Sequence, residues 1–216
     1  MKHSGRFFAV GIILSLHTIY LVYYYFRDGQ IDIIDLLGYP LFYFIAYWCG
    51  KQYDKAQYFS EKDTLTNLYN RRFIMGAFDK IISFADRTNS KLFVLIIDCD
   101  NFKEINDSCG HTKGDLVLSN IANILLQSIR KSDVVARWGG DEFLIIGHYK
   151  DDAGLQTLIQ RLDDQLESLS QQMSLNIKIS IGSTIYPDDS NNLEELIKSA
   201  DQNMYKQKAQ NREKGE

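Results

Sequence analysis

Carboxylates stand at the end of one predicted strand, where a metal-binding site is easily built. The segment Lys91–Asp98 is an almost continuous apolar run, which predicts a buried central strand that ends in Asp98-Cys99-Asp100. A carboxylate at the end of a buried strand packs poorly but is a good ligand for a hard cation such as Mg²⁺, and the backbone carbonyl of Cys99 offers a further oxygen. We therefore favour metal binding over a solvated loop here.

A second acidic pair lies in the segment Asp133–Ile146. Two apolar runs flank Gly139-Gly140, the pattern of a β-hairpin whose tip requires positive φ. Asp141 and Glu142 follow at once, before the chain returns into a core. Glycines let a ligand approach the backbone closely, and carboxylates at such a turn suit a divalent cation. Taken alone, the segment fits a metal site and a solvated turn equally well.

The residues after Asp100 offer contacts for a phosphorylated ligand. Backbone N–H groups that open a helix favour phosphate, and Lys103 adds a positive charge beside them. Asn106, His111 and Asp115 are polar groups around a glycine-containing turn. These residues predict a binding region next to the first acidic pair.

The apolar spacing of the chain predicts the elements that position these residues. From Asp63 the expected order is helix, strand, helix, hairpin, helix, strand and helix, which indicates an α+β sheet with helices on its faces. Asp63 or Thr64 is the expected cap of the first helix. A capped amphipathic helix leaves the polar cluster Asn70-Arg71-Arg72 unexplained. The later elements are expected over residues 114–129, 154–169, 176–187 and 193–210.

Composition excludes some classes of function. The chain has 216 residues and a formal net charge of −4, which gives no reason to expect nucleic-acid binding. Cys49, Cys99 and Cys109 have neither paired nor metal-ligand spacing, so they fit free thiols in a reducing compartment.

Two apolar segments at the amino terminus indicate a membrane anchor. Residues 7–26 carry no formal charge and are long enough to span a bilayer, with tyrosines at their far end. Residues 33–50 are a weaker candidate, because Asp35 lies among them and Pro40 would bend a helix. A re-entrant or tilted helix stays open for this second segment. The first run is too long for a cleaved signal peptide and lacks a cleavage site.

The charges around the two segments predict their orientation. Lys2 and Arg6 precede the first segment and Lys51 and Lys55 follow the second, so both ends are expected in the cytoplasm. We expect a multi-pass protein of the inner (cytoplasmic) membrane with the lipid bilayer as a partner. The expected organisation is two transmembrane helices in residues 1–50 (about 7–26 and 33–50), a linker or signalling helix over 51–62, and a soluble domain over 63–216.

From Asp63 to Arg212 the chain resembles the GGDEF family of diguanylate cyclases. The resemblance covers nearly all of the soluble part and none of the membrane part. Several independent motifs match in the right order. They are Asp63-x-Leu-Thr-x-Leu-x-Asn-Arg-Arg72, Asp98-x-Asp-x-Phe-Lys-x-Ile-Asn-Asp107, Gly110-His-x-x-Gly-Asp115, Arg137-Trp-Gly-Gly-Asp-Glu-Phe143, Ser180-Ile-Gly182 and the run Ala200-Asp to Tyr205.

The resemblance implies a fold and an activity. The fold would be palm-like, related to nucleotidyl cyclases and polymerases, with a central, mostly antiparallel sheet flanked by helices. The reaction would condense two GTP molecules to cyclic di-GMP and two pyrophosphates in a homodimer. Two departures, Cys109 where the family often has Phe and Asn211 where it often has Gly, concern packing rather than chemistry.

The resemblance also implies a role for each residue of the acidic pairs. Asp98, the Cys99 carbonyl and Asp141 would hold Mg²⁺, or Mn²⁺ in its place. Asp141 would also be the base for the 3′-hydroxyl, and Glu142 belongs to the catalytic set. Lys103 would stabilise the charge that develops on the phosphate, because phosphoryl transfer depends mostly on positioning and charge neutralisation.

The substrate contacts implied by the resemblance come from two parts of the chain. Asn106 and Asp115 would face guanine, and Lys208 and Arg212 would reach the phosphates. Phe102 and His111 complete the set that would bind GTP.

Arg130-Lys-Ser-Asp133 stands at the position of the family's inhibitory product site, Arg-x-x-Asp. Arg130 could grip guanine or phosphate with two donors. The alternative is a purely structural role, in which the Arg ends a helix and the Asp opens a strand. The position within the family pattern favours an allosteric site for cyclic di-GMP.

Two other functions stay open at this point. A catalytically silent GGDEF module would bind GTP or cyclic di-GMP and signal through contacts. An enzyme of relaxed specificity would also make mixed cyclic dinucleotides. The presence of Asp98, Lys103, Asp141 and Glu142 favours catalysis.

Overall fold

The computed structural model of the chain describes residues 4–213, apart from the side chains of Gln207 and of residues 209–213. The chain divides into two compact units, Met1–Glu61 and Lys62–Glu216.

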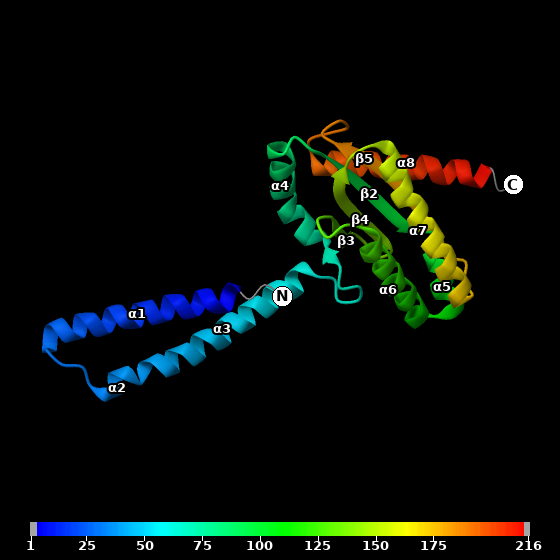
Figure 1. Cartoon of the computed structure of the whole chain (residues 1–216). Coiled ribbons are helices and arrows are strands. Elements are labelled where there is room, and N and C mark those ends of the chain that lie inside the picture. The colour runs from blue at the N-terminus through cyan, green and yellow to red at the C-terminus, as the bar shows by residue number, and fades with distance from the viewer. Residues whose placement is uncertain (1–3, 214–216) are drawn as a thin grey trace. The chain divides into compact units, whose positions relative to one another are not determined.

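The first unit is a pair of long helices. Helix α1 (Ser4–Asp28) and helix α3 (Gly38–Glu61) run side by side, and the short helix α2 (Ile33–Leu36) precedes α3 (Figure 1). Large apolar side chains on both helices are exposed, for example Phe7 at 69% and Phe44 at 69%. By length and composition, Ser4–Asp28 and Ile33–Glu61 can each cross a membrane.

Pro40 lies in the first turn of α3, just after the turn at Leu37 that separates α2 from α3, so its missing backbone N–H stands at the start of a helix. The two long helices are joined by a buried ion pair. Asp54 of α3 is 5% exposed, and it accepts hydrogen bonds from the N–H of Gly5 at 2.9 Å and from Nε of Arg6 at 3.1 Å.

The second unit is built on a five-stranded sheet with the order β1-β3-β4-β2-β5. Every neighbouring pair is antiparallel except β1 and β3, which are parallel. The long apolar strand β2 occupies an inner position, as its sequence predicts. The strands are β1 (Tyr69–Asn70), β2 (Lys91–Cys99), β3 (Val134–Arg137), β4 (Glu142–Tyr149) and β5 (Ile179–Tyr186).

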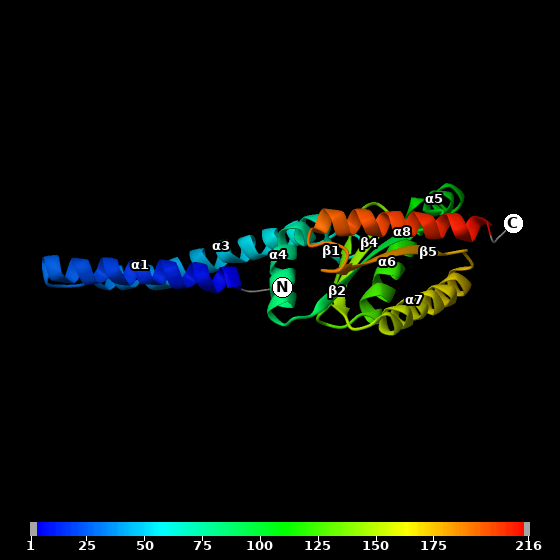
Figure 2. The same ribbon diagram turned by 90° about the horizontal axis from the view of Figure 1, so that it is seen from above.

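Helices cover both faces of the sheet, which confirms the predicted α+β architecture. Helices α4 (Arg71–Arg87) and α8 (Leu193–Glu213) pack on one face. Helices α6 (His111–Ser128) and α7 (Asp152–Met173) pack on the other, and Figure 2 shows the sheet between α8 and α7. The short helix α5 (Phe102–Cys109) follows the end of β2. The sheet therefore lies between two apolar cores, and its strand ends carry the polar residues.

The expected cap of the first helix is wrong. Asn70, not Asp63 or Thr64, is the N-cap of α4, and its side chain accepts a hydrogen bond from the N–H of Phe73 at 3.0 Å. Asp63 closes a turn instead by accepting from the N–H of Thr66 at 2.9 Å. This explains one member of the polar cluster that the apolar pattern alone left open.

The hairpin of β3 and β4 is present, but its tip differs from the expectation. Neither Gly139 nor Gly140 has positive φ. The loop between the strands is closed by the N–H groups of Trp138 and Gly139, which donate to the carbonyl of Glu142 at 2.8 and 3.2 Å. A loop longer than a two-residue turn reverses the chain without left-handed residues.

Candidate active site

The sheet brings the two acidic pairs together. Asp98, near the end of β2, lies directly opposite Glu142, the first residue of β4. The N–H of Cys99 donates to the carbonyl of Asp141 at 3.1 Å, so the turn before β4 is fixed to the end of β2. Residues opposite each other in an antiparallel pair point to the same face. Asp98 and Glu142 therefore share the face that α4 and α8 cover.

The carboxylates of this region lie close enough to one another to shift pKa values. Partial burial, and then the charge of Asp98, raise the pKa of Asp141 above its ordinary value. Burial, followed by the charges of Asp201 and Asp98, raises the pKa of Glu142. Burial and Asp98 likewise raise the pKa of Asp201 in α8. Such a group of neighbouring carboxylates favours a bound cation.

One cation of the chain already contacts this group. Nζ of Lys208 in α8 lies 2.5 Å from Oδ1 of Asp98 and 3.2 Å from Oδ1 of Asp100. Burial lowers the pKa of Lys208, but the hydrogen bonds and charges of Asp98 and Asp100 outweigh it and leave that pKa raised. Lys208 was expected to reach phosphates, and its contact with the acidic pair was not foreseen. Arg212 was given the same role, but its side chain lies outside those that the structure describes.

The donors at this place fit Mg²⁺. Burial, with the charge of Asp141 next, raises the pKa of the Cys99 thiol to about 12. The thiol therefore stays protonated and is no metal ligand, so Cys99 can contribute only its backbone carbonyl oxygen. Among the described residues, no group of three or more His, Cys, Asp or Glu side chains is arranged to hold a metal. Two carboxylates and a carbonyl are nevertheless sufficient, because Mg²⁺ takes its other ligands from water and substrate phosphates.

Helices α5 and α6 place the predicted nucleotide contacts. Asn101 starts α5 in the left-handed conformation, with φ 53°, and Lys103 is exposed in the first turn. Phe102 and Asn106 turn toward α6 at Gly114, where an added Cβ would lie 3.2 Å from the Phe102 ring and 3.0 Å from Cγ of Asn106. A larger residue at Gly114 would therefore push α6 away from α5.

Two further predicted contacts lie on α6 itself. His111 and Asp115 are exposed on its first turns, in the same region as the α5 residues. The chain thus gathers the side chains expected to bind guanine at one junction of two helices.

Arg137 ties the glycine turn to the start of the domain, which the sequence reasoning missed. Its Nη1 donates to Oδ1 of Asp63 at 3.1 Å, and its Nε donates to the carbonyl of Gly140, also at 3.1 Å. Burial raises the pKa of Asp63, but hydrogen bonds from Thr66 and Arg137 outweigh it and hold that pKa below its ordinary value. Both partners belong to family motifs, but only the fold shows that they meet.

Trp138, also in the glycine turn, packs under the guanidinium of Arg71, 4.7 Å from the ring centroid. Arg71, the first residue of α4, thereby links this helix to the glycine turn. A turn held at several points keeps Asp141 and Glu142 in place.

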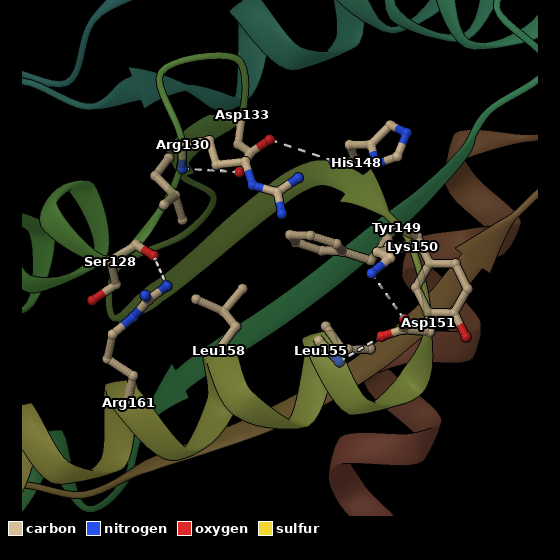
Figure 3. Close-up of a pocket in the computed structure, with 13 residues that line it drawn as sticks. Ser128, Arg130, Asp133, His148, Tyr149, Lys150, Asp151, Leu155, Leu158 and Arg161 are labelled. Carbon is tan, nitrogen blue, oxygen red and sulfur yellow. Dashed lines mark hydrogen bonds and ion pairs between the residues drawn. The ribbon is translucent and has the colours of Figure 1, made fainter.

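A pocket lies at the opposite end of β4, away from the acidic pairs. Figure 3 shows it between the loop after α6, the end of β4 and α7, with Arg130 and Asp133 in its wall. The carboxylate of Asp133 accepts from the N–H of Arg130 at 3.0 Å and from the N–H of His148 at 3.4 Å. Lys150 and Arg161 also line the pocket, and Arg161 donates to the carbonyl of Ser128.

The composition of this pocket suits an anion with apolar surfaces. Its lining includes the apolar side chains of Phe93, Leu155 and Leu158 and the basic side chains of Arg130, Lys150 and Arg161. Arg130 and Asp133 both line this cavity, which is separate from the acidic pairs.

Comparison with known proteins decides the family. The sequence profile described as "Diguanylate cyclase, GGDEF domain" matches residues 60–214. The chain belongs to the GGDEF family. Diguanylate cyclase DosC of Escherichia coli (strain K12) is 36% identical over 159 residues, which cover 69% of this chain and 34% of DosC. Cyclic di-GMP phosphodiesterase NbdA of Pseudomonas aeruginosa is 34% identical over 152 residues, covering 68% of this chain and 19% of NbdA.

Solved GGDEF structures show the same fold. The GGDEF domain of TpbB from Pseudomonas aeruginosa has a TM-score of 0.64 and 36% identity, covering 69% of this chain and 89% of that domain. The coiled coil and GGDEF domain of DgcB from Caulobacter crescentus, solved with c-di-GMP, has a TM-score of 0.65 and covers 74% of this chain and 86% of DgcB. At 23% identity, this second likeness concerns the fold alone.

The palm-like GGDEF fold expected from the motifs is thereby confirmed. The chain spans about a third of the length of the curated cyclases it matches, such as DosC with 34%. The relatives therefore inform the GGDEF part of this chain.

Proposed function

We propose that the protein is a diguanylate cyclase, which condenses two GTP molecules to cyclic di-GMP and releases two pyrophosphates. The observation that supports the proposal is that the turn before β4, fixed to the end of β2, holds Asp141 close enough to Asp98 for their charges to interact, next to the ammonium of Lys208. Two neighbouring carboxylates beside a lysine suit a metal-bound triphosphate.

The acidic residues would have distinct tasks. Asp98, Asp141 and the carbonyl of Cys99 would hold Mg²⁺, or Mn²⁺, which supplies charge neutralisation for the triphosphate when bound. Asp141 would accept the proton of the 3′-hydroxyl, whose oxygen forms a bond to the α-phosphorus of the second GTP as pyrophosphate leaves. Glu142 would support this set from its place opposite Asp98.

The remaining residues would bind and orient the nucleotide. Lys103, Lys208 and Arg212 would neutralise the charge of the phosphates. Asn106 and Asp115 would hydrogen-bond the edge of guanine, with Phe102 and His111 completing the pocket. A buried polar site that leaves the wrong base unpaired can discriminate by about 10⁴, which favours GTP over ATP.

The product has two-fold symmetry, and each domain would bind one GTP. Two copies must therefore face each other with their acidic pairs on either side of the forming bonds. The transmembrane segments in residues 1–50 and the helical stretch 51–62 would bring two chains together in the inner membrane, with both termini and the catalytic domain over 63–216 in the cytoplasm.

The pocket around Arg130 and Asp133 would bind cyclic di-GMP and inhibit the enzyme. Its basic side chains can pair with phosphates, and its apolar side chains can cover the base. Inhibition by the product would limit its own accumulation.

The test is a product assay with the purified full-length protein in detergent, supplied with GTP, ATP and Mg²⁺. Cyclic di-GMP as the single cyclic product is the expected result. Mixed cyclic dinucleotides would identify an enzyme of relaxed specificity. No cyclic dinucleotide, together with retained binding of GTP or cyclic di-GMP, would identify a silent signalling module instead.

A further inference from the structure

Lys208 contacts a carboxylate that has no task in the proposed mechanism. Its Nζ lies 3.2 Å from Oδ1 of Asp100 as well as 2.5 Å from Oδ1 of Asp98. Asp98 is the carboxylate that would hold the metal ion. An ammonium group has three donors, so Lys208 can bind Asp100 and a phosphate at the same time. Asp100 is thus the partner that stays available to Lys208 when Asp98 is engaged by a cation.

The carboxylate of Asp100 is itself held in place by β5. The N–H of Asp100 donates to the carbonyl of Lys178 at 2.9 Å, and Oγ of Ser180 donates to Oδ1 of Asp100 at 2.7 Å. Ser180 is 8% exposed and lies opposite Asp98 in the ladder between β2 and β5. A hydroxyl that is fixed by a strand gives its partner carboxylate one orientation.

Lys208 needs such a partner because its side chain is long and flexible. A lysine loses up to about 2 kcal/mol of rotamer entropy when it is fixed. Helix α8 is fixed to the sheet through Ala200 and Met204, which are buried and precede Lys208 by at least one turn. The side chain of Lys208 is 25% exposed, and the contacts that direct it are those with the two aspartates.

We propose that Asp100 and Ser180 are positioning residues, which hold the ammonium of Lys208 where it meets the triphosphate of the bound nucleotide. This rests on the function proposed above. Neither residue touches the nucleotide. Ser180 orients Asp100, and Asp100 orients Lys208, so that the positive charge is in place before the substrate arrives.

The test is equilibrium binding to the full-length protein in detergent with Mg²⁺. The probes are 3′-deoxyguanosine triphosphate, which lacks the attacking hydroxyl and is not converted to a cyclic product, and guanosine, which lacks phosphates. Asp100→Asn is expected to weaken binding of the triphosphate about tenfold, the size typical of a lost charged hydrogen bond, and to leave guanosine binding unchanged. Ser180→Ala is expected to act in the same direction by about threefold.

The matched control is Asp188→Asn. Asp188 accepts from Nζ of Lys91 at 2.6 Å, an ion pair of the same kind in which both side chains are about half exposed. Its removal is expected to change the affinity for neither probe.

A double-mutant cycle separates positioning from a general structural effect. In a Lys208→Met background, Asp100→Asn is expected to cause no further loss, because Asp100 acts through Lys208. Equal losses in both backgrounds, or an equal loss for guanosine, would overturn the inference. The wild-type protein could make cyclic di-GMP while the Asp100→Asn and Ser180→Ala variants bind the triphosphate with normal affinity. That result would overturn this inference and leave the proposed function standing. A wild-type protein that makes none would overturn the proposed function, and the inference with it.

Discussion

Arg137 and Asp63 are 74 residues apart in the sequence, and they form an ion pair that fixes the glycine turn. Their side chains are 17% and 21% exposed, and Arg137 also donates to the carbonyl of Gly140. The position of Asp141 and Glu142 therefore depends on the first residues of the domain. The ion pair connects the start of the folded domain with the proposed catalytic turn.

Asp63→Asn is expected to destabilise the fold by about 1–2 kcal/mol, because it weakens the bonds to Arg137 and Thr66. It should also lower the turnover rate, since the turn is less firmly held. Thermal unfolding and initial rates measure the two effects. Asp79→Asn, on the exposed side of α4, is the control. Full activity with an unchanged unfolding temperature would show that the ion pair does not position the turn.

The same variant should show a particular pH dependence. The pKa of Asp63 is lowered in the folded state, so its ionisation stabilises the fold above the ordinary value of 3.8, and this contribution is lost as the pH falls through the lowered pKa. The stability difference between wild type and Asp63→Asn should be largest near neutral pH and shrink below pH 3.8. Denaturant titrations across this range measure it. A difference that grows in acid would contradict the assigned sign.

Substitution of Asp98 or of Asp141 should abolish catalysis without unfolding the protein. Asp98→Asn and Asp141→Asn are each expected to lower the rate of cyclic di-GMP formation at least about 10²-fold, because each removes one proposed ligand and its charge. The rate should be measured over a range of Mg²⁺ concentrations. Near-normal rates at saturating Mg²⁺ in both variants would exclude Asp98 and Asp141 as the metal site.

Gly182 sets how closely α8 approaches β5. A Cβ at this position would lie 2.8 Å from Cβ of Met204 and would collide with the carbonyl of Ala200. Gly182→Ala is expected to cost about 1–3 kcal/mol and to raise KM for GTP, because α8 carries Lys208 with it. Unfolding and steady-state kinetics measure the two effects. Ser183→Ala, one residue further along the strand, should leave KM unchanged.

Removal of the guanidinium from the distal pocket should relieve product inhibition. Arg130→Ala is expected to raise the concentration of cyclic di-GMP needed for half inhibition at least about tenfold, with little change in the uninhibited rate. Progress curves with added product measure this, and the exposed neighbour Lys131→Ala is the matched control. If cyclic di-GMP inhibits the Arg130→Ala variant as strongly as the wild type, the pocket is not the product site.

The sequence predicts the helices and strands of this domain well where apolar residues recur with a single spacing. The apolar run of β2 and the spacing of the helices both lead to the observed sheet and its covering helices. The helix cap was misplaced because Asp63 and Asn70 are both good capping residues, and only the tertiary contact with Arg137 decides between them. Capping propensity alone does not distinguish Asp63 from Asn70, because both residue types are favoured at the N-cap.

Contacts across long stretches of sequence were the part that could not be predicted. Asp98 and Lys208 are 110 residues apart, and nothing in either segment indicates that an ammonium group lies on that carboxylate. Their meeting depends on the depth at which α8 packs, which in turn depends on Gly182. Motifs identified the residues, whereas the packing of the sheet and helix determined their distances.

The contact of Lys208 with Asp98 and Asp100 gives these carboxylates a counter-ion within the chain itself. Folding and metal loading can then be separate events, since part of the acidic charge is neutralised before any nucleotide arrives. A chelator should accordingly stop synthesis while leaving the unfolding temperature almost unchanged. The proposed cyclase would then stay folded in the absence of substrate, ready for GTP and a second copy of the chain.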